Sequence, residues 1–125
     1  MTPHFDAKEL ACRCGCGMLP QQDFMDKVEI LRVRAGFSMP VTSAARCPTH
    51  NAEVSHTGRS GPHTTGRAID LAVSGQRALE LVRMALASGF TGLGVKQHGP
   101  HEGRLVHLDD LPNKDGQPRP HIWSY

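Results

Sequence analysis

Apolar side chains recur at helical spacing in two stretches of the chain. In the first, steps of four, three and four residues place the apolar positions on one face of a helix. These positions are Phe24, Val28, Leu31 and Ala35. The pattern predicts a core-covering helix over residues 20–35, with Pro20 in its first turn and Gly36 just past its end. A second helix is expected over residues 76–88, after Ser74 as a plausible N-cap. Its predicted apolar face is formed by Ala78, Val82 and Ala85, with Leu79 and Leu86 beside them.

Short apolar or alternating runs between these helices predict strands. The four runs are residues 39–44, 68–73, 92–95 and 105–108. Shorter helical turns are expected over residues 5–11 and 48–55. Thirteen glycines and nine prolines indicate many loops and short elements. Together these features predict an α+β fold, in which helices pack against a small, mainly antiparallel sheet.

The 125 residues correspond to a single domain, residues 1–125. Within it, residues 1–19 form a cysteine-containing N-terminal segment and residues 110–125 a proline-rich tail. The only Trp and the only Tyr lie in the last three residues, so we expect the tail to pack back on the body.

Charge and hydropathy argue against two classes of binding partner, nucleic acids and membranes. The net charge is +2 with no long basic run, which argues against nucleic-acid binding. No stretch approaches the roughly 20 apolar residues of a membrane span, so we expect no membrane insertion. The N-terminus lacks a basic segment followed by an apolar one. We therefore expect a monomer made in the cytoplasm without its own export signal, which another component must release if its substrate lies outside.

Two histidines and a carboxylate from separate segments are the strongest chemical signal. His63 and Asp70 are seven residues apart with Gly66 between them, and His107 lies far downstream. In a fully extended strand His63 and Asp70 would be about 23 Å apart, so the chain must turn at the glycine to bring them together. Asp70 interrupts an apolar strand, and a buried carboxylate needs a metal or a cationic partner. A catalytic zinc uses three such N and O ligands and keeps one position open.

Simpler roles for these residues stay open at this point. Asp70 could instead form a structural ion pair with Arg67 or Arg46. In the loop that precedes the last strand, His98 and His101 are expected to be solvent-exposed.

Four cysteines form a second pattern with several interpretations. Cys12, Cys14 and Cys16 alternate near the N-terminus, and Cys47 is the only other cysteine. The spacing is not the paired CxxC of a zinc knuckle. The four thiols could be reduced, could hold a structural metal, or could include one disulfide to Cys47. Nothing pairs any of them with a base, so no catalytic role is expected.

Taken together, the motifs resemble those of the zinc D-alanyl-D-alanine peptidase family. The resemblance is carried by His63-x-x-Gly-x-Ala-x-Asp70 followed by His107-x-Asp109, and it extends over most of the chain. The segment 5–12 looks like the start of the small single-domain branch, and the segment 41–51 looks like the part ahead of its metal loop. The resemblance implies a zinc site on the sheet face of a fold similar to that of hedgehog and D,D-peptidase domains.

Family resemblance implies one catalytic zinc ion held by His63, Asp70 and His107. It places Arg46 near the substrate carbonyl or carboxylate, where a fixed guanidinium suits an oxyanion. Gly61 and Arg104 depart from the pattern, since related chains often have Ser at the first position and an acidic base at the second. Because Arg104 cannot accept a proton, another residue must serve as general base.

Asp109 is the first expectation for that base, because strand alternation puts it on the same face as His107. Glu102 is the second, on a loop that could fold over the site, and His98 and His101 are weaker options.

The resulting hypothesis is a zinc metallopeptidase that hydrolyses peptidoglycan stem peptides, as a carboxypeptidase or as an endopeptidase such as a phage lysis enzyme. One alternative is a non-catalytic zinc-containing module that binds cell wall or protein. Another is a purely structural role for Asp70 and the histidines, with the cysteines holding the only metal.

Overall fold

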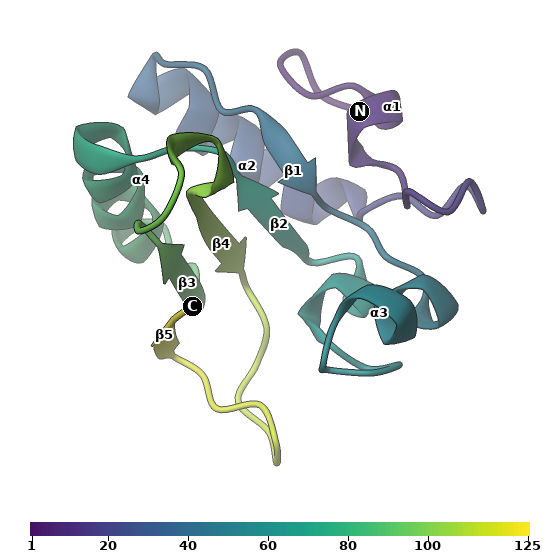
Figure 1. Ribbon diagram of the computed structural model, residues 1–125. Helices are drawn as coiled ribbons and strands as arrows, with labels where there is room; N and C mark the ends of the chain where they lie inside the picture. The colour runs from purple at the N-terminus through teal and green to yellow at the C-terminus, as the bar shows by residue number, and fades with distance from the viewer.

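A five-stranded sheet forms the centre of the protein, which is described by a computed structural model of residues 1–125 (Figure 1). Its strands are β1 (Val41–Ser43), β2 (Ala68–Leu71), β3 (Gly92–Lys96), β4 (Leu105–Asp109) and β5 (His121–Ser124). Across the sheet they run in the order β1-β2-β4-β3-β5. Only the β3–β5 pair is parallel, which confirms the predicted α+β fold with a mainly antiparallel sheet.

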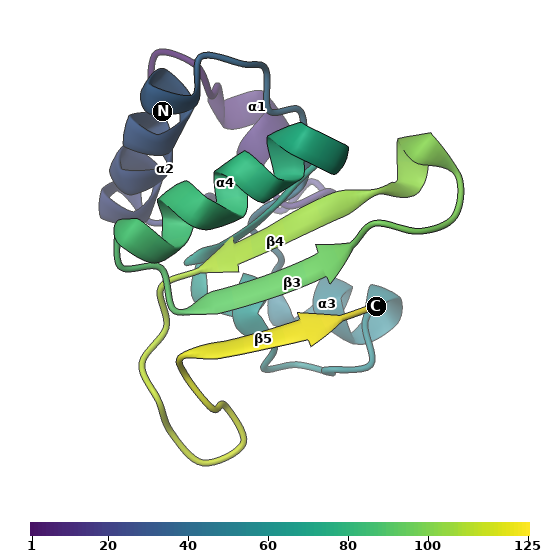
Figure 2. The same cartoon turned by 90° about the vertical axis from the view of Figure 1, so that its left-hand side faces the viewer.

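Four α-helices and two short 3₁₀ helices surround this sheet. They are α1 (Ala7–Leu10), α2 (Gln22–Ala35), α3 (Pro48–Val54), α4 (Gly75–Ala87), η1 (Pro62–Thr65) and η2 (His101–Gly103). Helices α2 and α4 lie together over one face of the sheet, whereas α3 lies on the other side (Figure 2). None of the helices has both the length and the apolar character needed to cross a membrane.

The face under α2 and α4 carries the hydrophobic core. Strand register aligns Ile69, Leu108 and Leu93 across neighbouring strands, and all three are buried. Because side chains alternate along a strand, the next row points to the opposite face. That row consists of Asp70, His107, Gly94 and Trp123. The helices therefore fix one face by apolar packing and leave the other to polar groups.

The predicted helices form, with small shifts at their boundaries. Helix α2 begins at Gln22, so Pro20 precedes it rather than occupying its first turn. Gly36 adopts the left-handed conformation just past its end (φ 72°), as the sequence predicts. Asp6 caps α1, accepting a hydrogen bond from the Glu9 backbone N–H at 2.8 Å.

The predicted apolar face of α4 is the one that packs on the core, because Ala78 and Ala85 are buried and Val82 is partly buried against the same cluster. The two leucines expected beside that face are not part of it. Leu79 and Leu86 are 72% and 58% exposed, and Leu81 is fully buried. Leu81 and Met84, which the sequence analysis did not assign to this face, are buried beside Ala78 and Ala85. Because apolar residues surround much of the helix, periodicity alone does not tell which leucines are buried.

The tail returns to the sheet as an edge strand. After β4 the chain makes a loop and comes back as β5, hydrogen-bonded in parallel to β3 (Figure 2). This return places Trp123 beside Gly94 on the polar face.

Candidate metal centre

Strand register brings two of the expected ligands together. Asp70 on β2 lies directly opposite His107 on β4 in an antiparallel pair. Cross-strand neighbours on one face have Cβ atoms about 5 Å apart, so their side chains meet above the sheet. His107 Nδ1 lies 2.9 Å from Asp70 Oδ1. Both side chains are buried, with 2% of His107 and 7% of Asp70 exposed.

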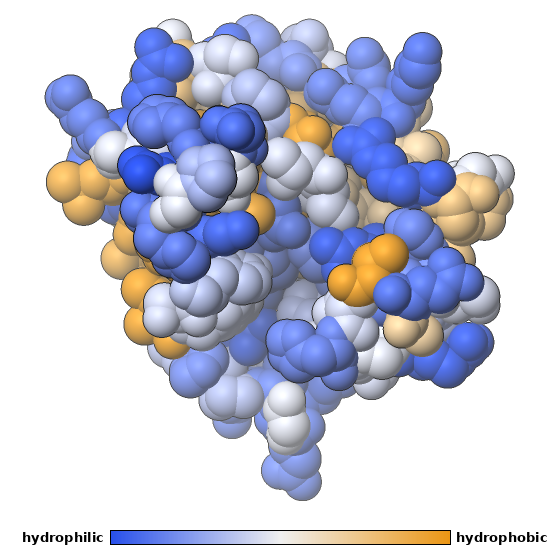
Figure 3. All heavy atoms as spheres, in the orientation of Figure 1, coloured by the Kyte–Doolittle hydropathy of each residue, from blue (hydrophilic) through white to orange (hydrophobic).

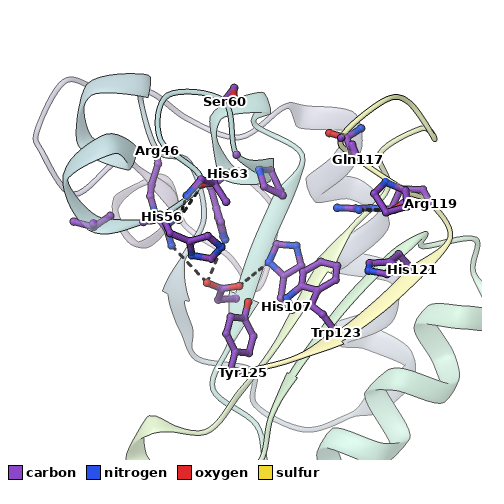
Figure 4. A pocket seen from close by; sticks show the side chains of 18 of the residues that line it. Arg46, His56, Ser60, His63, His107, Gln117, Arg119, His121, Trp123 and Tyr125 are labelled. Atoms are coloured by element: carbon purple, nitrogen blue, oxygen red, sulfur yellow. Dashed lines mark hydrogen bonds and ion pairs between the residues drawn. The ribbon is translucent and has the colours of Figure 1, made fainter.

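The third expected ligand comes from η1, which folds over the end of β2. Gly66 ends η1 in the left-handed conformation (φ 75°), so the chain reverses where the sequence analysis expects a turn. His63 Nε2 thereby comes within 3.2 Å of Asp70 Oδ2, and the His63 side chain is buried. The ligand atoms of His63, Asp70 and His107 all lie within 4.8 Å of one another. Figure 4 shows the two imidazoles pointing toward one another from different elements.

In each imidazole the outer nitrogen, the one that points away from Asp70, is already hydrogen-bonded. His63 Nδ1 donates to the carbonyl oxygen of Ala44 at 2.7 Å, because a carbonyl can only accept. In the neutral ring Nε2 then carries a lone pair, which points at a carboxylate oxygen of Asp70. His107 likewise faces carboxylates with both nitrogens, at Asp70 and at Asp109. Lone pairs that face one another in this way call for a cation between them, either protons or a metal.

The pKa shifts of Asp70 and His107 also favour a cation at this centre. Burial raises the pKa of Asp70, but its interactions with the His107 and His63 side chains outweigh burial and hold that pKa well below its usual range. Burial lowers the pKa of His107, whereas its hydrogen bonds to Asp109 and Asp70 raise it, and the net pKa is raised. Asp70 is therefore ionised, and its charge would stabilise a cation at this point.

Arg46 reaches the same carboxylate from the loop after β1. Its Nη2 lies 3.7 Å from Asp70 Oδ2. Its Nε donates to Ser43 Oγ at 3.1 Å, and its Nη1 donates to Asn51 Oδ1 at 3.0 Å. These bonds hold the guanidinium at the edge of the site. Arg67, the other cation considered for Asp70, instead bonds Asp110 on the opposite face.

Asp109 lies behind His107 and has no exposed surface. Its Oδ2 accepts from His107 Nε2 at 2.8 Å and from Arg119 Nη2 at 2.8 Å, and its Oδ1 accepts from Arg119 Nε at 2.9 Å. Burial raises the pKa of Asp109, but His107 and Arg119 lower it to about 2. Sequence reasoning places Asp109 on the face of His107, and the structure shows the two in direct contact. The sequence analysis did not identify Arg119, because nothing in a proline-rich tail marks an arginine as the partner of a strand carboxylate.

Two glycines on β3 make room for this arrangement. A Cβ on Gly94 would lie 2.6 Å from Trp123 Nε1, and a Cβ on Gly92 would lie 2.2 Å from Asp109 Oδ1. Both glycines stand opposite site residues of β4 in register, Gly94 beside His107 and Gly92 beside Asp109. The Trp123 ring consequently packs on the His107 ring with centroids 4.9 Å apart. The alternate glycines of β3 are the sequence signal that could have pointed to these close approaches.

The centre opens into a cavity of about 910 Å³. One wall is formed by the loop after α3, including His56, and by η1. The other is formed by the returning tail with Arg119, His121, Trp123 and Tyr125 (Figure 4). The surrounding surface is mainly hydrophilic (Figure 3). Asp70 is the only Asp or Glu that lines the cavity.

The side chains considered as bases lie elsewhere. Asp109 is covered by His107 and Arg119, and Glu102 is exposed on η2. Neither lines the cavity. His101 is also exposed on η2. His98 Nε2 donates a hydrogen bond to the Tyr125 backbone oxygen at 2.9 Å.

Comparison with known families agrees with this geometry. The family model described as Peptidase M15 matches residues 3–109 of the 125, well over half of the chain. The chain belongs to the M15 peptidase family. M15 peptidases are zinc-dependent, so membership supports zinc peptidase activity, and the matched segment contains His63, Asp70 and His107. No curated protein and no solved structure matches the chain.

Proposed function

We propose that this M15 family member hydrolyses peptide bonds in bacterial peptidoglycan, with His63, Asp70 and His107 holding one zinc ion. The observation that carries the proposal is the convergence of three buried ligand atoms on one point of a polar cavity, with the outer imidazole nitrogens already bonded. Two imidazoles and one carboxylate fit the donor set of a catalytic zinc. When bound, zinc supplies Lewis acidity, which polarises a carbonyl and lowers the pKa of a water molecule toward about 7.

The chain's own residues would orient and stabilise the substrate. The Arg46 guanidinium, fixed by Ser43 and Asn51, is placed to donate hydrogen bonds to an oxyanion or a terminal carboxylate. The Tyr125 hydroxyl points into the site (Figure 4). Burial and the nearby charge of Asp70 raise the pKa of Tyr125, so its hydroxyl keeps its proton and can donate to the substrate oxygen.

Proton transfer is assigned to an imidazole rather than to a carboxylate. Asp109 and Glu102 do not line the cavity, so in this proposal Asp109 positions His107 and Glu102 has no part. His56 and His121 are the two cavity imidazoles outside the ligand set, and imidazole is the side chain most used as general acid and base. Replacing the correct one with Ala should lower kcat by about 10²-fold or more and leave the zinc content unchanged.

The direct test is digestion of purified peptidoglycan, with and without a chelator, followed by mass spectrometry of the products. Release of D-alanine alone identifies a carboxypeptidase, and release of longer peptides or loss of cross-links identifies an endopeptidase. The activity should disappear with chelator and return with zinc. His63→Ala and Asp70→Ala should both lose the metal of this site, and unchanged occupancy there in both variants would rule out the ligand assignment.

A binding module without turnover is the second candidate function. The observation in its favour is that no Asp or Glu side chain other than the proposed ligand Asp70 lines the cavity. A folded, zinc-loaded protein that binds wall peptides and releases no product from any of them would support this function instead.

A further inference from the structure

Four thiols meet at a second point of the molecule, away from the polar cavity. Cys12, Cys14 and Cys16 lie in the segment after α1, and Cys47 is the N-cap residue of α3. The fold brings these two segments together although they are more than 30 residues apart. Cys12 Sγ lies 3.4 Å from Cys14 Sγ, and Cys14 Sγ lies 3.6 Å from Cys47 Sγ. All four sulfur atoms lie within 4.8 Å of one another.

The sulfur separations fit four ligands of one ion. A disulfide has an S–S distance of about 2.05 Å, and all four cysteines here are free. A tetrahedral zinc with Zn–S bonds of about 2.3 Å places its sulfurs about 3.8 Å apart. The separations of 3.4 Å and 3.6 Å lie close to that value. Four unrelated thiols have no reason to gather this closely from two distant segments, one of them at a helix start.

The backbone around the thiols is arranged for sulfur that carries negative charge. The Cys47 N–H donates to Cys12 Sγ at 3.3 Å, and the His50 N–H donates to Cys47 Sγ at 3.4 Å. Such N–H donors stabilise a thiolate, the form that binds metal. The segment curls around the site at Gly15 and Gly17, both with left-handed backbone angles (φ 86° and 89°).

We propose that Cys12, Cys14, Cys16 and Cys47 bind a second metal ion, a structural zinc, independently of the His63, Asp70 and His107 centre. Four protein ligands leave no open position, so this ion stabilises the fold and takes no part in hydrolysis. It ties the N-terminal segment to the start of α3. Arg46 immediately precedes Cys47, so the same ion fixes the loop that presents this arginine to Asp70.

Metal stoichiometry tests the proposal directly. The protein is purified under reducing conditions with zinc, and bound metal is measured by mass spectrometry of the digested sample. The wild type should hold two zinc ions per chain, and Cys16→Ser and His63→Ala should each hold one. Cys16 is exposed, so its replacement removes a ligand without opening the core. Arg13→Ala, an exposed change between the same cysteines, is the matched control and should hold two.

Measurements that need no cysteine variant keep the proposal testable if Cys16→Ser fails to fold. In the wild type, thiol-reactive reagents should modify the four cysteines slowly, and rapidly after a strong chelator is added. His63→Ala loaded with cobalt should show the thiolate-to-cobalt charge-transfer absorption of a sulfur-ligated ion. One zinc per wild-type chain, lost in His63→Ala and kept in Cys16→Ser, would overturn the proposal. A mass deficit that reveals a disulfide in the freshly purified protein would overturn it as well.

Discussion

Replacing Asp109 by Asn separates its two conceivable roles. In the structure its carboxylate accepts from His107 and receives two hydrogen bonds from Arg119. An amide of the same shape keeps one acceptor oxygen and turns an NH₂ group toward one of these donors. The charge-assisted bond that fixes the His107 ring is then weakened or lost.

The size of the effect follows from that contact. Outer partners of metal-binding histidines contribute about 10–100-fold to metal affinity, which corresponds to about 1.4–2.7 kcal/mol. If Asp109 positions His107, Asp109→Asn should weaken zinc binding at this centre by that factor, and excess zinc should restore most of the activity. If Asp109 is the general base, zinc affinity should stay the same, and kcat should fall about 10²–10⁴-fold at saturating zinc.

The assay is a zinc competition titration against a chelator, followed by activity measured as a function of free zinc. Asp110→Asn is the matched control, because it makes the same chemical change one residue along on the other side of the sheet. Its carboxylate bonds Lys27 and Arg67, away from the centre, so zinc affinity should stay unchanged. An Asp109→Asn variant with wild-type zinc affinity and an activity loss that excess zinc does not rescue would refute the positioning role.

Three further substitutions probe the site and its support. Arg46→Met should lower kcat/KM about 10²-fold with zinc content unchanged, as measured by steady-state kinetics, and wild-type activity would exclude Arg46 from the site's chemistry. Gly94→Ala should displace Trp123, the only tryptophan, and lower the free energy of unfolding by about 1–3 kcal/mol, seen as a change in intrinsic fluorescence and in denaturant unfolding. Gly103→Ala should do neither, because its Cβ would meet only the Lys96 Nζ, at an ordinary contact distance of 3.8 Å. Asp110→Asn should lower the free energy of unfolding by about 2 kcal/mol at pH 7. Burial raises the pKa of Asp110, but Arg67 and Lys27 lower it by more, so the net pKa lies below its usual value. The ionised carboxylate therefore stabilises the fold above about pH 4, and this stabilisation is lost as the pH falls through the lowered pKa. The acid unfolding profile of the variant should lack this pH-dependent loss.

The parts of the site that could be predicted from the sequence are those encoded within one segment. Between His63 and Asp70 the sequence has a glycine, Gly66, at which the chain can turn. The structure forms that turn with Gly66 in the left-handed conformation. Strand alternation correctly puts His107 and Asp109 on one face, where they are in contact. Apolar periodicity located the helices and the buried face of α4, but it wrongly put the exposed Leu79 and Leu86 beside that face.

The remaining features depend on contacts that only the fold creates. Whether Asp109 faces the cavity or lies beneath His107 is decided by Arg119, which arrives on the returning tail. The parallel pairing of β5 with β3 sets Trp123 over Gly94, and no local pattern encodes that pairing. The meeting of the alternate cysteines with Cys47 likewise results from packing of the N-terminal segment against the start of α3.

Charge balance at the centre makes a final prediction about the substrate. Asp70 and Asp109 are matched by Arg46 and Arg119, so with neutral imidazoles the protein groups sum to about zero before a metal binds. A zinc ion adds two positive charges, and no further Asp or Glu side chain lines the cavity to neutralise them. The loaded cavity should therefore attract an anionic group, and this attraction should weaken as salt screens it.

A stem peptide ending in a free carboxylate should accordingly show a KM that rises with ionic strength, and the same peptide with an amidated end should show a smaller rise. The comparison uses steady-state kinetics in a chloride series at constant free zinc. A large difference between the two peptides supports recognition of a terminal carboxylate, as a carboxypeptidase requires. Equal salt dependence would show that the extra positive charge interacts only with the oxygen of the bond being cut and not with a terminal carboxylate. That behaviour is expected of an endopeptidase.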